Sequence, residues 1–182
     1  MNVTVKRDGL TLCGVLEGTE SLQNKQVAIL MHGFQGNRGY EAGNLLYDLS
    51  HKLNEAGIPT LRFDFGGCGK GDGAFTDMTV YSEINDGMKI IDFALSQIKA
   101  QQIYLIGHSQ GGVVASMLSA YYRDIITKEV LMAPAATLKD DALKGVCQGT
   151  KYDPTSHPIN DRCSWNCCKW RIFPGSPITA DL

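Results

Sequence analysis

Short runs of consecutive apolar residues recur along the chain, and each run is bounded by glycine, proline or polar residues. The four clearest runs cover residues 27–31, 60–63, 103–106 and 130–133. Runs that are apolar at nearly every position, rather than at every second one, are typical of parallel strands buried on both faces of a sheet. The pattern therefore predicts four central parallel strands.

Amphipathic segments separate these runs. Leucines at positions 45, 46, 49 and 53 share one helical face, and apolar residues step by three or four between residues 84 and 98. A third helix is predicted to begin directly after Ser109. Strands that alternate with helices predict the fold class α/β, with a mostly parallel sheet covered by helices on both faces.

The first segment, residues 3–17, alternates more weakly between apolar and polar residues around Asp8 and Gly9. An Asp-Gly pair favours a two-residue turn between antiparallel strands. We expect a β-hairpin here that leads into the sheet.

Charge and composition narrow the functions open to this chain. Its 182 residues, 43% of them hydrophobic, suit one globular domain, and 17 basic against 19 acidic residues give a net charge of −2. The basic residues are scattered, which argues against nucleic acid or an acidic membrane surface as a partner. No secretion signal or bilayer-spanning run is evident, so a cytoplasmic protein without membrane contact is expected. A homo-oligomer remains open.

The third apolar run leads into Gly107-His108-Ser109-Gln110-Gly111 and then into the predicted helix. A strand, a Gly-x-Ser-x-Gly turn and a helix in this order are typical of hydrolases with a serine nucleophile. The two glycines allow the tight turn that exposes the Ser109 hydroxyl. The backbone N–H of Gln110, at the helix start, lacks an intrahelical partner and is predicted to donate to an oxyanion. We expect His108 to pack rather than to act on the hydroxyl.

A second donor is predicted in the loop after the first central strand. The sequence there is His-Gly-Phe-Gln-Gly-Asn at residues 32–37, where hydrolases of this kind place another oxyanion N–H. Gly33 allows close approach, so the backbone N–H of Phe34 is the predicted donor and its ring a wall of an apolar acyl pocket. The His32 side chain is expected to brace the loop.

A third loop, residues 64–73, is rich in glycine and invites a phosphate-binding interpretation. It lacks the Gly-Lys-Ser/Thr ending of a P-loop, and no Gly-x-Gly-x-x-Gly helix start follows. We expect Asp64 to brace this loop by accepting hydrogen bonds from backbone amides.

Three of the six cysteines, Cys163, Cys167 and Cys168, crowd the tail, and the others are scattered. This pattern does not match a disulfide framework. Together with His157 the three form an alternative set of zinc ligands, although their spacing does not match paired Cys-x-x-Cys sites. We therefore expect no metal site and no cofactor.

Four segments together carry a resemblance to a known family. They are His-Gly-Phe-Gln-Gly-Asn at 32–37, Arg-Phe-Asp-Phe-Gly-Gly-Cys-Gly at 62–69, Gly-His-Ser-Gln-Gly-Gly at 107–112 and Ala-Pro-Ala-Ala at 133–136. As a set they resemble the bacterial cinnamoyl (feruloyl) esterases of the α/β-hydrolase superfamily, over residues 1–153.

This resemblance implies a serine carboxylester hydrolase that acts on small-molecule hydroxycinnamic (feruloyl-type) esters through an acyl-enzyme on Ser109. Phe34 and Gln110 would supply the oxyanion amides, and no cofactor or metal would be needed. Each motif alone also occurs in other hydrolases. A thioesterase or a monoacylglycerol-lipase-like hydrolase is therefore an alternative.

The resemblance also divides the chain. Residues 1–136 match the N-terminal part of the α/β-hydrolase core, residues 137–155 match the start of an inserted lid, and residues 156–182 form an atypical tail. The C-terminal strands of the fold would then be lacking. One hypothesis is that the reading frame shifts near residues 153–160 and leaves the tail out of frame. The alternatives are a divergent tail and a zinc knuckle.

In the family the triad acid and histidine follow the serine, in the order Ser, Asp, His. After Ser109 the only histidine is His157, with Asp153 four residues earlier and Asp140 and Asp141 before that. None follows a predicted strand that would position it within reach of the hydroxyl. The sequence therefore does not identify the catalytic base or acid, and a catalytically silent, truncated hydrolase fragment is the competing interpretation.

Overall fold

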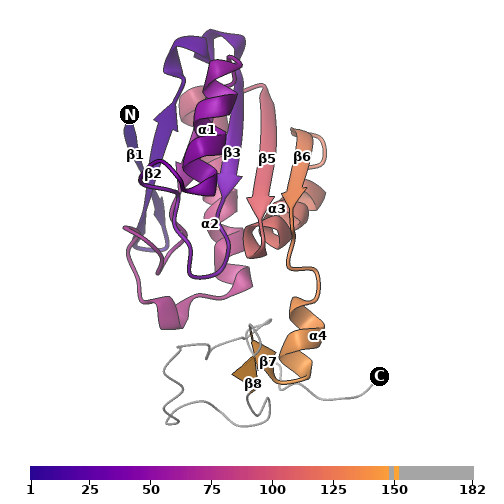
Figure 1. The fold of residues 1–182 in the computed structure, drawn as a ribbon. Coiled ribbons are helices and arrows are strands. Elements are labelled where there is room, and N and C mark those ends of the chain that lie inside the picture. The colour runs from indigo at the N-terminus through magenta and orange to yellow at the C-terminus, as the bar shows by residue number, and fades with distance from the viewer. Residues whose placement is uncertain (148–149, 152–182) are drawn as a thin grey trace.

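The computed structural model describes residues 1–147 and 150–151. Its main feature is a six-stranded sheet with the order β1-β2-β4-β3-β5-β6 (Figure 1). The strands are β1 (Asn2–Arg7), β2 (Leu10–Glu17), β3 (Gln26–Met31), β4 (Thr60–Phe63), β5 (Gln102–His108) and β6 (Ile126–Met132). β3 pairs in parallel with β4 and β5, and β5 pairs in parallel with β6, whereas β2 runs antiparallel to β1 and β4. The predicted mostly parallel sheet is confirmed.

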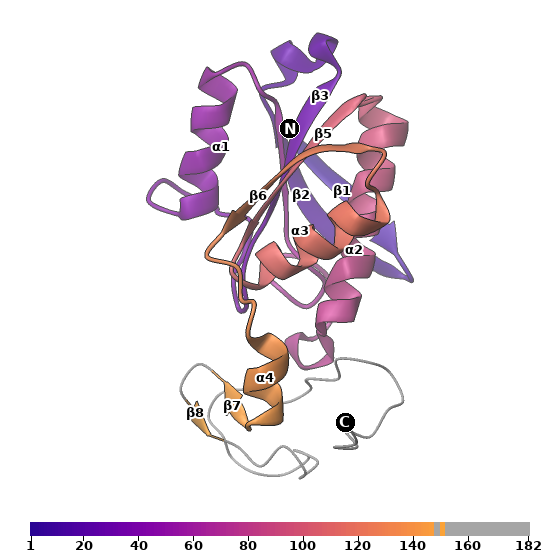
Figure 2. The ribbon, with the colours of Figure 1, turned by 90° about the vertical axis from the view of Figure 1, so that its right-hand side faces the viewer.

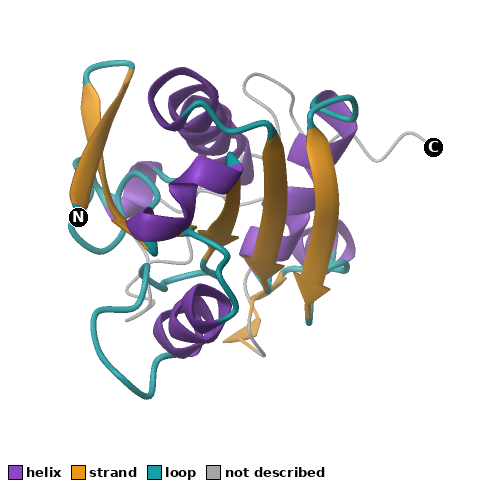
Figure 3. Ribbon diagram, turned by 90° about the horizontal axis from the view of Figure 1, so that it is seen from above, coloured by secondary structure: helices purple, strands orange, loops and turns teal. Residues whose placement is uncertain are grey.

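Helices cover both faces of this sheet, as the alternating pattern predicts. α1 (Leu45–Glu55) lies on one face, and α2 (Val80–Phe93) and α3 (Gln110–Tyr121) lie on the other (Figure 2). The same layers are seen from above in Figure 3. The start of α1 is capped by the Asn44 side chain, which accepts the Leu46 N–H at 3.1 Å. At the start of α2, Thr79 and Ser82 form a reciprocal capping box.

The predicted hairpin is formed by β1 and β2, and its turn consists of Asp8 and Gly9. Both turn residues have positive φ, 49° and 85°. Such a turn matches the twist of the two strands that it joins. The hairpin adds the antiparallel side of the sheet through the pairing of β2 with β4.

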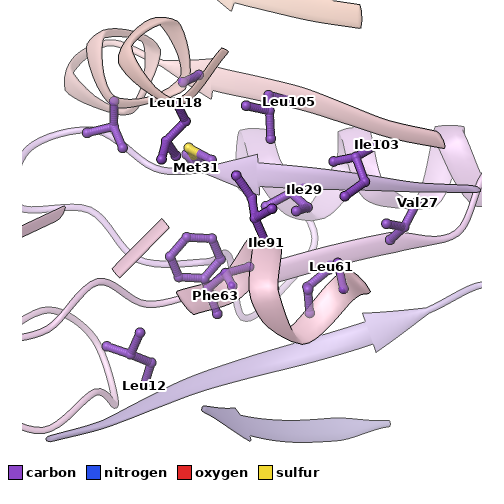
Figure 4. Close-up of a cluster of buried hydrophobic side chains, with 14 of the residues drawn as sticks. Leu12, Val27, Ile29, Met31, Leu61, Phe63, Ile91, Ile103, Leu105 and Leu118 are labelled. Atoms are coloured by element: carbon purple, nitrogen blue, oxygen red, sulfur yellow. The ribbon is translucent and has the colours of Figure 1, made fainter. Parts of the chain in front are cut away.

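Alternate residues of β3 divide the core into two parts. Val27, Ile29 and Met31 join the larger cluster on the α2 and α3 face (Figure 4), while Ala28 and Leu30 join Leu46 of α1 on the other face. Successive side chains of a strand point to opposite faces, so an apolar run serves both clusters at once. Burial of each such leucine or isoleucine side chain stabilises the folded state by about 1.5–3 kcal/mol relative to leaving it exposed. The continuous apolar runs are therefore the source of the core.

Two elements differ from the predicted boundaries. β6 begins at Ile126, four residues before the predicted strand. The apolar pattern missed this start because the next three residues are polar and exposed in an edge strand: Thr127, Lys128 and Glu129. Polar residues are tolerated there, which hides the strand start from an apolar pattern. The predicted helix over 84–98 is α2 followed by a π-helical turn, η3 (Ala94–Ile98).

After β6 the chain leaves the sheet. Beyond the carboxyl ends of β3, β5 and β6 lie a short helix, α4 (Leu138–Leu143), and a small antiparallel hairpin (Figure 1). The hairpin consists of β7 (Val146–Cys147) and β8 (Thr150–Lys151). Two short 3-10 helices, η1 (Thr19–Asn24) and η2 (Phe75–Asp77), lie in loops. That residues 137–155 begin a lid stays a prediction, and the predicted tail of 156–182 lies outside the described residues. Within the described residues, no helix is long and apolar enough to cross a membrane.

Candidate active site

Ser109 occupies the turn between β5 and α3. Its backbone has φ 54° and ψ −118°, a conformation that non-glycine residues rarely adopt. Backbone strain of this kind costs about 1–3 kcal/mol and persists only where the surroundings enforce it. The turn thus has the strained strand-to-helix geometry of a nucleophile elbow.

The glycines on either side of Ser109 are required by close backbone contacts. A Cβ on Gly107 would collide with the Gly111 carbonyl, and a Cβ on Gly111 would collide with the carbonyl oxygens of Met31 and His32. Both glycines are therefore needed for the tight turn, as the sequence predicts.

Hydrogen bonds from β6 and the residues after it fix the Ser109 backbone. The Ser109 N–H donates to the Met132 carbonyl at 3.0 Å, and the Ala135 N–H donates to the Ser109 carbonyl at 3.0 Å. Pro134 packs close to Gly112, where a Cβ would lie 3.0 Å from its ring. The strained residue is therefore anchored by an element that follows it by more than twenty residues.

The loop after β3 lies against the Ser109 side chain. A Cβ on Gly33 would lie 2.9 Å from the Ser109 Cβ and 3.4 Å from its Oγ, so only glycine allows this approach. Phe34 follows directly, and its ring lies 5.3 Å from that of Phe75, centroid to centroid. The structure thus brings the two segments of the predicted oxyanion site together. That the N–H groups of Phe34 and Gln110 donate to an oxyanion stays a prediction.

His32 connects the loop after β3 with the loop after β4. Its Nε2 accepts the Phe65 N–H at 3.2 Å, and its Nδ1 donates to the Gly33 carbonyl at 2.8 Å. Burial lowers the pKa of this imidazole, against the opposing effects of the Gly33 carbonyl and of Asp64. His32 is therefore a neutral brace, as expected, and both ring nitrogens are already engaged.

Asp64 braces the glycine-rich loop, as the sequence predicts. Its carboxylate accepts the backbone N–H groups of Arg38 at 2.7 Å and Lys70 at 3.1 Å, and the Tyr40 hydroxyl at 2.9 Å. It also forms a buried ion pair with the Arg38 guanidinium, which the sequence did not indicate. The glycine-rich loop is thus held by the Asp64 carboxylate.

The side chain of Gln110 is bound to a residue that the sequence analysis missed. Its Nε2 donates to Glu83 Oε2 of α2 at 2.6 Å, and both side chains are buried. Burial raises the pKa of Glu83 to about 8, and Asp86 adds to the rise while the hydrogen bond from Gln110 opposes it. One signal was present in the sequence, since Glu83 shares the helical face of Gly87 and Ile90.

No histidine bonds the Ser109 hydroxyl within residues 1–147 and 150–151. His51 stacks on Tyr47 and bonds its carbonyl, and His108 is half-buried beside Ser109. His157 and Asp153 lie outside the described residues. The catalytic base is therefore not identified by the described part of the chain.

The candidate zinc ligands, His157 and the three tail cysteines, also lie outside the described residues. Within the described part, no group of three or more His, Cys, Asp or Glu side chains is arranged to hold a metal ion. Cys68 is buried there, and burial, with Glu83, Asp64 and Asp86, raises the pKa of its thiol to about 12. It is thus a packed side chain rather than a reactive thiolate.

The mostly parallel sheet with helices on both faces and the strained serine turn between β5 and α3 are features of the α/β-hydrolase fold. The chain belongs to the alpha/beta hydrolase fold family, whose model matches residues 27–148. No curated protein matches it.

Solved structures give more particular similarities. The chain is 32% identical to Est1E from Butyrivibrio proteoclasticus with ferulic acid bound, with a TM-score of 0.77 over 86% of this chain and 62% of that one. A second Est1E structure gives 29% identity and a TM-score of 0.71 over 86% and 60%. The Pyrococcus furiosus esterase Pf2001 shares the fold, with 24% identity and a TM-score of 0.68 over 82% and 57%. The chain thus spans about three fifths of the length of these structures.

Proposed function

We propose that this chain carries the nucleophile and oxyanion half of a serine carboxylester hydrolase. Ser109 Oγ attacks the ester carbonyl carbon, and the resulting oxyanion accepts hydrogen bonds from the Phe34 and Gln110 backbone N–H groups. The alcohol leaves with a proton, and water then cleaves the acyl-enzyme to release the acid and restore the serine hydroxyl. The observation that carries this proposal is the strained Ser109 turn packed against Gly33.

For the substrate we propose a hydroxycinnamic ester of the feruloyl type. The similarity to Est1E, one structure of which has ferulic acid bound, supports this choice. The ring contact between Phe34 and Phe75 next to the Ser109 loop supplies an aromatic surface suited to such an acyl group.

A catalytically silent chain is the second candidate, and a specific observation favours it. No described histidine contacts the Ser109 hydroxyl, and removal of the base from a serine hydrolase typically lowers kcat about a million-fold. Such a chain would keep the serine turn without turnover.

Labelling with a fluorophosphonate and hydrolysis of ethyl ferulate test these candidates. Wild type is compared with Ser109→Ala and with Ser96→Ala, which changes an exposed serine of η3. The proposed function predicts that only Ser109→Ala loses labelling and hydrolysis. Equal labelling and equal hydrolysis in wild type and Ser109→Ala would instead support the catalytically silent chain. A preference for short aliphatic esters or thioesters over ethyl ferulate would refute the proposed substrate alone.

A further inference from the structure

A buried polar pair joins α2 to the first residue of α3. Glu83 and Gln110 are each 1% exposed, and their side chains are hydrogen bonded. One turn after Glu83, Gly87 lies so close to Leu118 of α3 that a Cβ would collide with the leucine side chain. The pair therefore lies at a tight contact between α2 and α3, and its Gln110 directly follows Ser109.

Within the part of the chain that the structure describes, each partner keeps one buried oxygen without a hydrogen bond, Glu83 Oε1 and Gln110 Oε1. An ionised Glu83 would make both of these oxygens acceptors, and leaving buried acceptors unpaired is costly. A neutral carboxylic acid carries a proton that the Gln110 oxygen can accept. The two unpaired oxygens are therefore complementary only when Glu83 is protonated.

The charges around Glu83 also favour its neutral form. From its own helix the Asp86 carboxylate opposes ionisation of Glu83. The Cys68 thiol of the glycine-rich loop also lies within electrostatic reach, but it is uncharged because its pKa is raised to about 12. α3 contributes the neutral Gln110 amide. Arg7 of β1 is paired with Asp86, at 2.5 Å between Nε and Oδ1. The Arg7 guanidinium therefore forms its ion pair with Asp86 and not with Glu83.

We propose that Glu83 is a positioning residue: as a neutral carboxylic acid it closes a two-point pair with the Gln110 amide and so fixes the direction of the Gln110 backbone N–H beside Ser109. The pair is independent of any activity, whereas the positioning role rests on the proposed function. Ionisation of Glu83 opens the pair and puts a negative charge near the site where an oxyanion would form. Reactivity of Ser109 should therefore fall as the pH rises through the Glu83 pKa of about 8.

Infrared spectroscopy tests the pair directly. A difference spectrum of wild type minus Glu83→Gln should contain the C=O band of one neutral carboxyl group about two pH units below the Glu83 pKa of about 8. The band should disappear as the pH is raised through that value. Glu129→Gln, which changes an exposed carboxylate of β6, is the matched control and should give no such band. Absence of the band in the Glu83 difference spectrum would overturn the proposal.

The positioning role is tested by the rate constant for fluorophosphonate modification of Ser109. Glu83→Leu removes the pair and should lower this rate constant about tenfold at low pH, since a small displacement of a catalytic group has an effect of this size or larger. Glu83→Gln keeps a two-point amide pair but cannot ionise. The ratio of the Glu83→Gln to the wild-type rate constant should therefore rise about tenfold across the Glu83 titration, a change that a purely structural role would not produce.

The outcomes separate this inference from the proposed function. A neutral-carboxyl band with parallel pH profiles in wild type and Glu83→Gln would refute the positioning role while the pair stands. Failure of Glu83→Leu to fold leaves the Gln variant to decide. If wild type is never labelled above the Ser109→Ala background, the proposed function and the positioning role fall together, and the infrared band alone decides the pair.

Discussion

The centre of the sheet and its β6 edge are built from different residues, and Ser109 depends on both. All four residues of β4 are buried, whereas every residue of β6 is half-buried or exposed. The central strands place Gly33 against the serine, and the edge strand anchors the serine backbone through Met132. The two regions thus contribute unequally to the core but jointly to the geometry of the site.

The largest difference between centre and edge should appear when core volume is removed. Leu105→Ala in β5 empties a fully buried position and should lower the free energy of unfolding by about 2–5 kcal/mol. Val130→Ala in β6, at 48% exposure, should cost less than about 1 kcal/mol. Urea unfolding of the two variants measures both values, and similar losses would mean that β6 is as well packed as the centre.

Charge removal should give the next largest contrast. Asp64→Asn leaves the Arg38 guanidinium without its buried partner and should cost about 3 kcal/mol. Glu129→Gln on the edge should change the free energy of unfolding by about 0.5 kcal/mol or less. Denaturant midpoints decide this comparison, and a neutral Asp64→Asn would contradict the bracing role of that carboxylate.

The pH dependence of stability should differ between the buried and the exposed carboxyl group. The folded pKa of Glu83, about 8, lies above its unfolded value of 4.5, so the folded chain binds more protons between these values. The contribution of Glu83 is fully present below pH 4.5 and is lost as the pH rises through about 8. Denaturant midpoints of wild type should therefore fall across this window more steeply than those of Glu83→Gln. Glu129→Gln should follow wild type, and a flat Glu83 contribution would contradict the raised pKa.

The smallest effect on stability, but a visible one on association, is expected at the edge itself. Among the described residues β6 is the last strand of the sheet, and its Val130 and Leu131 are 48% and 42% exposed. Edge strands of this kind promote pairing between chains. Wild type should therefore associate, and Val130→Lys should shift it toward monomer in sedimentation experiments with little change in unfolding free energy. A monomeric wild type would contradict this expectation.

The sequence predicted the centre of the molecule well because burial there leaves a strong pattern. Continuous apolar runs located β3, β4 and β5, and Asp8 with Gly9 located the hairpin turn. The Gly-x-Ser-x-Gly motif located the strained turn, since its glycines are dictated by local backbone contacts. Local chemistry of this kind can be read without knowledge of distant segments.

Some features that depend on distant segments were not predicted. The start of β6 was missed because an exposed edge imposes no apolar pattern. The Glu83 partner of Gln110 was missed because 27 residues separate the two, and only the packing of α2 on α3 brings them together. A buried acid on an apolar helical face indicates that a partner exists but not which residue it is.

The hydrogen bonds between Ser109 and the chain around Ala135 have a consequence for synthesis of the protein. A nascent chain that has reached Tyr121 already contains the whole serine motif, yet neither the Met132 acceptor nor the Ala135 donor has been made. Since domains fold as the chain emerges and long-range contacts form late, the serine turn should mature only after β6 has docked beside β5. The residues of the motif are thus synthesised before the residues that hold the Ser109 backbone in its strained conformation.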